Sequence, residues 1–134
     1  MNIVITGGSG FVGSYLCERL INDGHNLIVV DNLLTGSTEN ISDLMDNDNF
    51  SFIEHDVQNH IEIENKVDYV LHFASAASPK AYTEHPVNTL KAGSIGTLNT
   101  LGLAKKHNSQ YLLASTSEVY GCLLYTSPSP RDRS

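Results

Sequence analysis

Positive charge, cysteine and long apolar runs are all scarce in this sequence of 134 residues. Eight lysines and arginines stand against 15 aspartates and glutamates, a formal net charge of -7, which argues against a nucleic acid or an anionic membrane as the partner. No apolar run approaches the roughly 18 residues that a membrane span needs. Cys17 and Cys122 are too few for a disulfide framework. Because the first apolar segment follows Met1 directly, with no room for a signal peptide, we expect a cytoplasmic protein.

The remaining composition is that of an ordinary globular protein, long enough for one domain and too short for two. Apolar segments of the buried-strand type alternate with helical and polar segments. The predicted strands are 2–6, 27–31, 50–54, 68–72 and 110–114, and the predicted helices are 11–23, 38–45 and 86–107. This alternation predicts an α/β fold, a Rossmann-type doubly wound parallel sheet with strand order 3-2-1-4-5.

A glycine-rich turn between the first strand and the first helix is the most informative stretch. Gly7, Gly10 and Gly13 have the spacing G-x-x-G-x-x-G, a looser relative of the dinucleotide fingerprint. A pyrophosphate can approach the bare backbone of such a turn, and Gly13 lets the helix lie close against the strand. Asp31 ends the second strand. Its carboxylate can accept both adenosine ribose hydroxyls and repels a 2′-phosphate, so NAD is favoured over NADP; the alternative is an ordinary aspartate in a turn.

Polar and small residues follow the other predicted strands. Asp56 is placed to bond the adenine amino group, although on its own it is more typical of an ordinary loop residue. Small residues from Ala74 onward leave space for a ligand beside the glycine turn. His72 is interpreted as a hydrogen-bonded core histidine in preference to a ligand or base. The six histidines lack metal-site spacing, so no metal is predicted.

The long helix carries Gly93, Gly96 and Gly102, each costing it about 1 kcal/mol relative to alanine. That cost predicts a close backbone approach to the crevice or to another helix. Lys91 either points into the crevice or is a solvated surface lysine. Beyond the fifth strand, the hydroxyls and carboxylate of residues 115–118 are either a reaction centre or simple turn formers.

Several segments together resemble the extended short-chain dehydrogenases/reductases, the NAD-dependent epimerase/dehydratase family that acts on nucleotide sugars. They are TGGSGFVG (6–13), DNLLTG (31–36), HDV (55–57), SAASP (75–79), GTLNTLGLAK (96–105) and LLASTSEVYG (112–121). Within that family the likeness is greatest to the UDP-glucuronate decarboxylases, and it covers residues 1–121.

The resemblance implies a set of site residues. Those implied for NAD are Gly7, Gly10, Phe11 and Val12 at the pyrophosphate, Asp31, Asn32, Thr35 and Gly36 at the adenosine, Asp56 and Val57 at the adenine, and Phe73, Ala74, Ser75 and Lys91 at the crevice. Thr116 matches the catalytic Ser/Thr of the family, and Glu118 matches the acid of its decarboxylases and 4,6-dehydratases. Ser117 stands where the dehydratases carry aspartate, which favours decarboxylation. Gly93 departs from the asparagine of many relatives.

The implied reaction converts UDP-glucuronate to UDP-xylose and carbon dioxide through a 4-keto intermediate, in an enzyme that dimerises through the 86–107 helix. A nucleotide-sugar 4-epimerase or 4,6-dehydratase remains an alternative within the family. A non-catalytic NAD-binding module is an alternative of a different class.

The end of the sequence departs from the family. No tyrosine is followed four residues later by lysine, so the Tyr-x-x-x-Lys base motif of the family is not within these residues. Residues 122–134 (CLLYTSPSPRDRS) resemble a translated reading frame of a transposase-end sequencing adapter; a natural Ser/Pro-rich tail is the alternative. We therefore expect an incomplete NAD-binding domain at 1–121, a non-native disordered tail, and no activity in this fragment.

Overall fold

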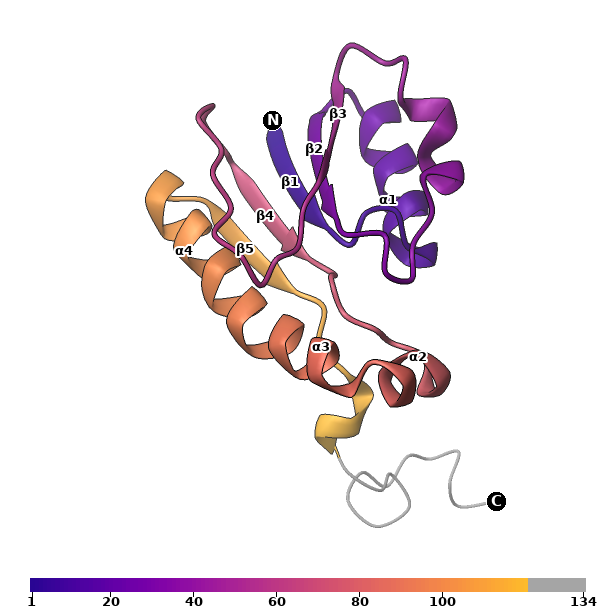
Figure 1. The fold of residues 1–134 in the computed structure, drawn as a ribbon. Coiled ribbons are helices and arrows are strands. Elements are labelled where there is room, and N and C mark those ends of the chain that lie inside the picture. The colour runs from indigo at the N-terminus through magenta and orange to yellow at the C-terminus, as the bar shows by residue number, and fades with distance from the viewer. Residues whose placement is uncertain (121–134) are drawn as a thin grey trace, which may run out of the picture.

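The structure, a computed structural model, describes residues 1–120; the predicted tail at 122–134 lies outside the described residues. A parallel sheet forms the middle layer (Figure 1). Its strands are β1 (Asn2–Thr6), β2 (Asn26–Asp31), β3 (Phe50–Glu54), β4 (Tyr69–His72) and β5 (Gln110–Leu113). They lie in the order β3-β2-β1-β4-β5, which confirms the predicted topology. The predicted strand ends are correct to within one residue.

The register of the sheet brings the functional segments to one edge. Thr6 at the end of β1 pairs with Val30 on β2 and with His72 on β4. The glycine turn, Asp31 and the residues after His72 therefore all lie at the carboxyl edge. The chain leaves β1 in one direction toward β2 and returns on its other side as β4, so the switch point of this sheet lies between β1 and β4.

Helices cover both faces of the sheet (Figure 1). Helix α1 (Phe11–Asn22) and the 3₁₀-helix η1 (Thr38–Leu44) cover one face, and α4 (Thr97–His107) covers the other. Because successive side chains of a strand point to opposite faces, β1 contributes to two cores. Ile3 and Ile5 pack with the α1 side, whereas Val4 packs with the α4 side. Burial on both faces explains why these strands are continuous apolar runs.

The predicted helix at 86–107 is confirmed with one difference. It consists of α3 (Pro86–Lys91), a π-helical turn η2 (Ala92–Gly96) and α4. Hydroxyl groups bond back to carbonyls one turn earlier: Ser94 Oγ to Leu90 O at 2.6 Å and Thr97 Oγ1 to Gly93 O at 2.8 Å. Such side-chain bonds to the main chain loosen the regular series of main-chain hydrogen bonds in a helix. A single π turn of this kind is frequent at functional sites.

Within the described chain, the predicted close approach is found at one of the three glycines of this helix. A Cβ at Gly96 would lie 2.7 Å from Val57 Cγ2, but Gly93 and Gly102 have no atom within 4 Å. The helix face at these two positions is open in the described chain, so their helical cost is not explained by packing within it.

The short helix α2 (Pro79–Glu84) was not predicted. Its start carries a clear local signal, because the Ser78 side chain accepts a hydrogen bond from Ala81 N at 3.2 Å and Pro79 occupies the first turn. Among the described residues, no helix is both long and apolar enough to cross a bilayer.

Candidate functional site

The glycine turn at the end of β1 has the geometry that its spacing predicts. Gly7 adopts φ +75°, and a Cβ there would lie 2.7 Å from Phe73 C and 2.8 Å from Ala74 N. A Cβ at Gly13 would collide with Gly7 O and lie 2.8 Å from Gly8 Cα. Gly13 therefore lets α1 approach the turn itself rather than the body of the strand. The two glycines keep a cradle of bare backbone that any side chain would fill.

Helix α1 begins at this cradle without a side-chain cap. Its N-cap is Gly10, and no acidic residue lies in the first turn. The N–H groups of the first turn, including those of Phe11 and Val12, have no acceptor within the helix. Both side chains are exposed, Phe11 by 79% and Val12 by 60%. What these two residues offer at the cradle is main-chain N–H at the positive end of a helix, a site for an anion.

Asp31 is held beside the glycine turn by two backbone hydrogen bonds. Ser9 N donates to Oδ2 at 3.0 Å and Leu33 N donates to Oδ1 at 2.9 Å. The residue is 7% exposed. A carboxylate can accept about four hydrogen bonds, so each oxygen keeps a lone pair for a ribose hydroxyl. Leu33 adopts φ +57° to make its bond, an uncommon conformation for a leucine.

The loop after β2 is anchored to Ser9, a residue that the sequence analysis did not single out. Ser9 O accepts from Ser37 N at 3.2 Å and from Asn40 Nδ2 at 2.8 Å. A Cβ at Gly36 would collide with Ser9 Oγ, so the predicted adenosine-side glycine is also needed for packing. Ser9 Oγ is buried and has no hydrogen-bond partner among residues 1–120. The only sequence signal for Ser9 is its place within the glycine turn.

Asn32, predicted at the adenosine, and Asp56, predicted at the adenine, are joined by a hydrogen bond. Asn32 Nδ2 donates to Asp56 Oδ2 at 3.0 Å, and Gln58 N donates to Asp56 Oδ1 at 2.9 Å. Val57 is 4% exposed, and its side chain packs in the α4-side core. Any contact of Val57 with a nucleotide would therefore come from its main chain.

Buried residues with reactive side chains support this edge. His72 is 3% exposed, with its Nδ1 atom 2.6 Å from Thr6 Oγ1, which confirms its interpretation as a hydrogen-bonded core histidine. Burial, assisted by the charge of Asp31, raises the pKa of the Cys17 thiol to about 12. Cys17 is therefore a packed thiol and not a nucleophile.

The structure brings most, but not all, of the predicted site residues together. Contacts link the glycine turn to Phe73 and Ala74, to Asp31 and to Gly36. Ser75 and Thr35 lie exposed in the adjoining loops. Lys91 ends α3 with an exposed side chain. Thr116 follows β5, and the side chain of Glu118, in η3 (Ser117–Tyr120), lies outside the described part of the chain.

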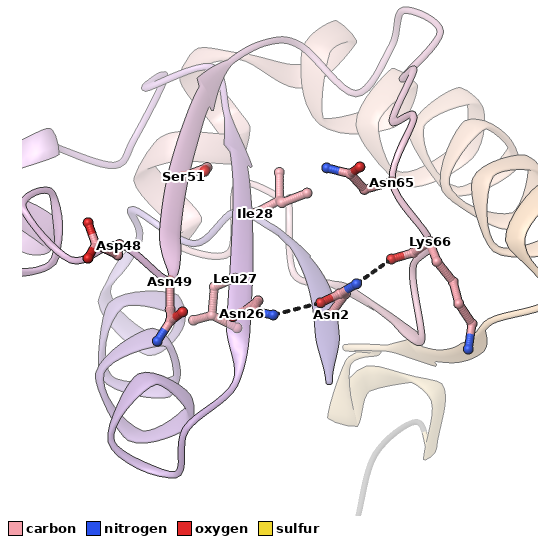
Figure 2. Close-up of a pocket in the computed structure, with 9 residues that line it drawn as sticks. All are labelled: Asn2, Asn26, Leu27, Ile28, Asp48, Asn49, Ser51, Asn65 and Lys66. Carbon is pink, nitrogen blue, oxygen red and sulfur yellow. Dashed lines mark hydrogen bonds between the residues drawn. The ribbon is translucent and has the colours of Figure 1, made fainter.

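Two clefts are measured in the described chain, and of the predicted site residues only Phe11 lines either of them. One of about 470 Å³ lies at the amino edge of the sheet (Figure 2). The other, of about 550 Å³, lies between α1 and η1. Neither is lined by Gly7, Asp31 or Asp56, so the candidate site is defined by backbone geometry and donors rather than by an enclosed volume. No cluster of three potential metal ligands occurs within residues 1–120.

The family model described as the NAD dependent epimerase/dehydratase family matches residues 3–133. The chain belongs to this family. UDP-glucuronic acid decarboxylase 1 of Danio rerio is 53% identical over 119 residues, which are 89% of this chain and 28% of that protein. UDP-glucuronic acid decarboxylase 4 of Arabidopsis thaliana is 51% identical over 121 residues, 90% of this chain and 27% of the relative. The chain thus spans less than a third of the length of these two relatives.

Solved structures of epimerases have the same arrangement of strands and helices. The UDP-glucose-4-epimerase of Stenotrophomonas maltophila, solved with bound NAD, superposes with a TM-score of 0.77 at 26% identity. The match covers 90% of this chain and 38% of that one. The glycine cradle, the uncapped start of α1 and the Asp31 carboxylate together fit a dinucleotide with a pyrophosphate and a ribose diol.

Proposed function

We propose that this chain is the cofactor-binding part of an NAD-dependent UDP-glucuronate decarboxylase, which converts UDP-glucuronate to UDP-xylose and carbon dioxide through a 4-keto intermediate. The observation that carries the NAD assignment is the juxtaposition of the Gly7–Gly13 cradle with the Asp31 carboxylate. The decarboxylase assignment is supported by the 53% and 51% identity to UDP-glucuronic acid decarboxylases. Conversion at the sugar requires the rest of the enzyme.

The main chain at the start of α1 would bind the pyrophosphate. The N–H groups of Phe11 and Val12 point out of an uncapped helix end, and Gly7 and Gly10 leave room for close approach. Asp31 would accept the adenosine ribose hydroxyls while its bonds to Ser9 and Leu33 fix its orientation. The same negative charge disfavours a 2′-phosphate.

In the proposed complex with NAD, Asn32, Thr35 and Gly36 would contact the adenosine. Asp56 and the main chain of Val57 would contact the adenine. The Asn32–Asp56 hydrogen bond holds these two loops together at 3.0 Å. Phe73, Ala74 and Ser75 would form the wall of the crevice. Lys91 would approach it from the end of α3.

At the sugar, the Thr116 hydroxyl would bind the oxygen that gains and loses charge, and Glu118 would be the acidic group of the reaction centre. NAD, when bound, supplies reversible hydride acceptance from the sugar C4, which makes the C5 carboxylate β to a ketone. The residues of the chain supply orientation and charge stabilisation. The family base, in Tyr-x-x-x-Lys, would be encoded beyond Gly121, and we expect the complete enzyme to be a homodimer.

Two measurements test this proposal. Calorimetry with this chain should show binding of NAD and weaker binding of NADP, and equal affinities would contradict the role of Asp31. The complete enzyme, incubated with UDP-glucuronate, should release carbon dioxide and form UDP-xylose, whereas this 134-residue chain should form none. Epimerised or dehydrated sugar without carbon dioxide would favour the 4-epimerase or 4,6-dehydratase alternative, and binding without turnover would favour a non-catalytic module.

A further inference from the structure

Ser9 connects the two parts of the candidate site through its main chain. Its N–H donates to Asp31 Oδ2 at 3.0 Å, and the residue is completely buried. The next peptide group joins Ser9 C=O to Gly10 N–H, and Gly10 N donates to Gly7 O at 3.2 Å. Because a peptide group is planar, the direction of Ser9 C=O fixes the direction of Gly10 N–H. The orientation of Ser9 therefore affects both the Asp31 carboxylate and the glycine cradle.

The carbonyl oxygen of Ser9 is held from outside the glycine turn. Asn40 Nδ2 donates to Ser9 O at 2.8 Å, and Ser37 N donates to the same atom at 3.2 Å. A carbonyl oxygen has two lone pairs, so these two donors use its whole capacity. The bond from Asn40 is the shorter one, and it joins residues that are 31 positions apart in the chain. The 3₁₀-helix η1 thus reaches the glycine turn through a side chain.

The helix that carries Asn40 has a fixed position. Asn40 N donates to Ser37 O at 3.1 Å, and the Ser37 hydroxyl accepts from Glu39 N at 3.2 Å at the start of the helix. Helix η1 lies against α1 (Figure 1). Ile41, the next residue, is completely buried and packs in the α1-side core. The core therefore holds η1 in the place from which Asn40 bonds Ser9.

We propose that Asn40 is a positioning residue for the dinucleotide. Its amide holds Ser9 C=O toward η1, so that Ser9 N–H keeps the Asp31 carboxylate in the orientation that accepts a ribose diol and repels a 2′-phosphate. This role rests on the proposed function, because the orientation of Asp31 is selective only if a dinucleotide binds there. It requires no contact between Asn40 and the cofactor.

The first test needs no ligand. Asn40→Leu keeps a side chain of similar size but removes the N–H group that donates to Ser9 O, without adding a charge. Asn40 is exposed, so the variant should fold. In NMR measurements of the 134-residue chain, the Ser9 amide should exchange about fivefold faster in the variant, relative to the amides of β1, as for the loss of one hydrogen bond of average strength. An unchanged rate at Ser9 would overturn the proposal.

The second test measures the choice of cofactor. For Asn40→Leu we expect NAD affinity by calorimetry to fall by about fivefold. NADP affinity should change less, because weaker bonding of its ribose and weaker repulsion of its 2′-phosphate by Asp31 oppose each other. The ratio of the two affinities should therefore fall. If Asn40 only stabilised η1, the variant would lose stability with an unchanged ratio, and that result would contradict the positioning role.

Ser42→Ala is the matched control on the same helix. The Ser42 hydroxyl bonds residues of η1 itself, Glu39 O at 3.0 Å and Asp43 Oδ1 at 3.4 Å. Its loss should lower stability without changing the Ser9 exchange rate or the ratio of NAD to NADP affinity. Equal changes in the two variants would show that Asn40 acts only through the stability of η1. If the unchanged chain fails to bind NAD, the proposed function fails, and the Ser9 exchange rate alone decides whether Asn40 holds Ser9.

Discussion

The two edges of the parallel sheet are both polar, yet they differ in what their polar groups contact. At the amino edge these groups bond one another (Figure 2): Asn26 Nδ2 donates to Asn2 Oδ1 at 2.8 Å, and Asn2 Nδ2 donates to Lys66 O at 2.8 Å. Asn2 N donates to Asp68 Oδ2 at 2.9 Å, and Lys66 Nζ lies 3.0 Å from the other oxygen, Asp68 Oδ1. At the amino edge, polar groups of neighbouring turns therefore hydrogen-bond one another around the cleft.

At the carboxyl edge the donors are left open. The first turn of α1 has no side-chain cap because residue 10 is glycine, and Asp31 keeps spare acceptor capacity. At Gly7 and Gly13 the main chain lies against main-chain atoms of other residues, with no room for a side chain between them. A measurable cleft is therefore a poorer guide to the candidate ligand site here than unsatisfied donors held by close-packed glycines. Four experiments test this difference between the two edges.

Gly13→Ala should have the largest effect. The new methyl group would collide with Gly7 O, so we expect a loss of about 3 kcal/mol in unfolding free energy, the upper range of overpacking, and no detectable NAD binding. Urea unfolding and calorimetry measure the two quantities. Gly102→Ala is the control, because that position is open and alanine should stabilise the helix by about 1 kcal/mol. Equal losses in the two variants would contradict the cradle.

Asp31→Asn should weaken NAD binding by about tenfold, the equivalent of a lost charged hydrogen bond, and reduce the preference over NADP. Asn2→Ala provides the comparison at the amino edge. It removes the bonds to Lys66 and Asn26 and should cost about 1 kcal/mol of stability with NAD affinity unchanged. A change in NAD affinity of similar size in both variants would show that the two edges do not differ in function.

Leu33→Gly should raise stability. Leucine at φ +57° is strained by about 1 kcal/mol, and glycine relieves that strain while keeping the N–H that bonds Asp31. Asn108, at φ +55° in the C-cap of α4, is the comparison, since asparagine tolerates this region and Asn108→Gly should change stability less. Thermal unfolding of the two variants checks the order; a larger gain at Asn108 would contradict it.

The two edges should also lose stability in different pH ranges. Burial lowers the pKa of His72 below its ordinary 6.5, so the unfolded chain binds the proton more readily and stability falls as the pH drops below about 6.5. At the amino edge, hydrogen bonds from Asn2 and Lys66 lower the pKa of Asp68 below 3.8. Its contribution is present above that pH and is lost only in stronger acid. In a plot of unfolding free energy against pH, His72→Gln should lose the decrease that begins below about pH 6.5. Asp68→Asn should lose the decrease in stronger acid.

Local patterns were sufficient to predict the strands, their order and the glycine turn. The runs around Ile3 to Ile5 and Leu27 to Val30 are apolar because both faces are covered, and burial of this kind is readable from sequence. Asp31 could be predicted because it ends such a run. Ser9 and Leu33 could not, because their importance comes from hydrogen bonds to residues distant from them in the chain or from a backbone angle that leucine rarely adopts.

The layered parallel sheet, the family and the residues at each strand end could be predicted from the amino-acid sequence alone, since apolar periodicity and glycine spacing are local properties of the chain. The folded structure was needed to show which glycines of the long helix are in contact, that Val57 turns its side chain into the core, and that His72 hydrogen-bonds Thr6. These depend on how closely two separate segments approach, which is set by the packing of the whole domain.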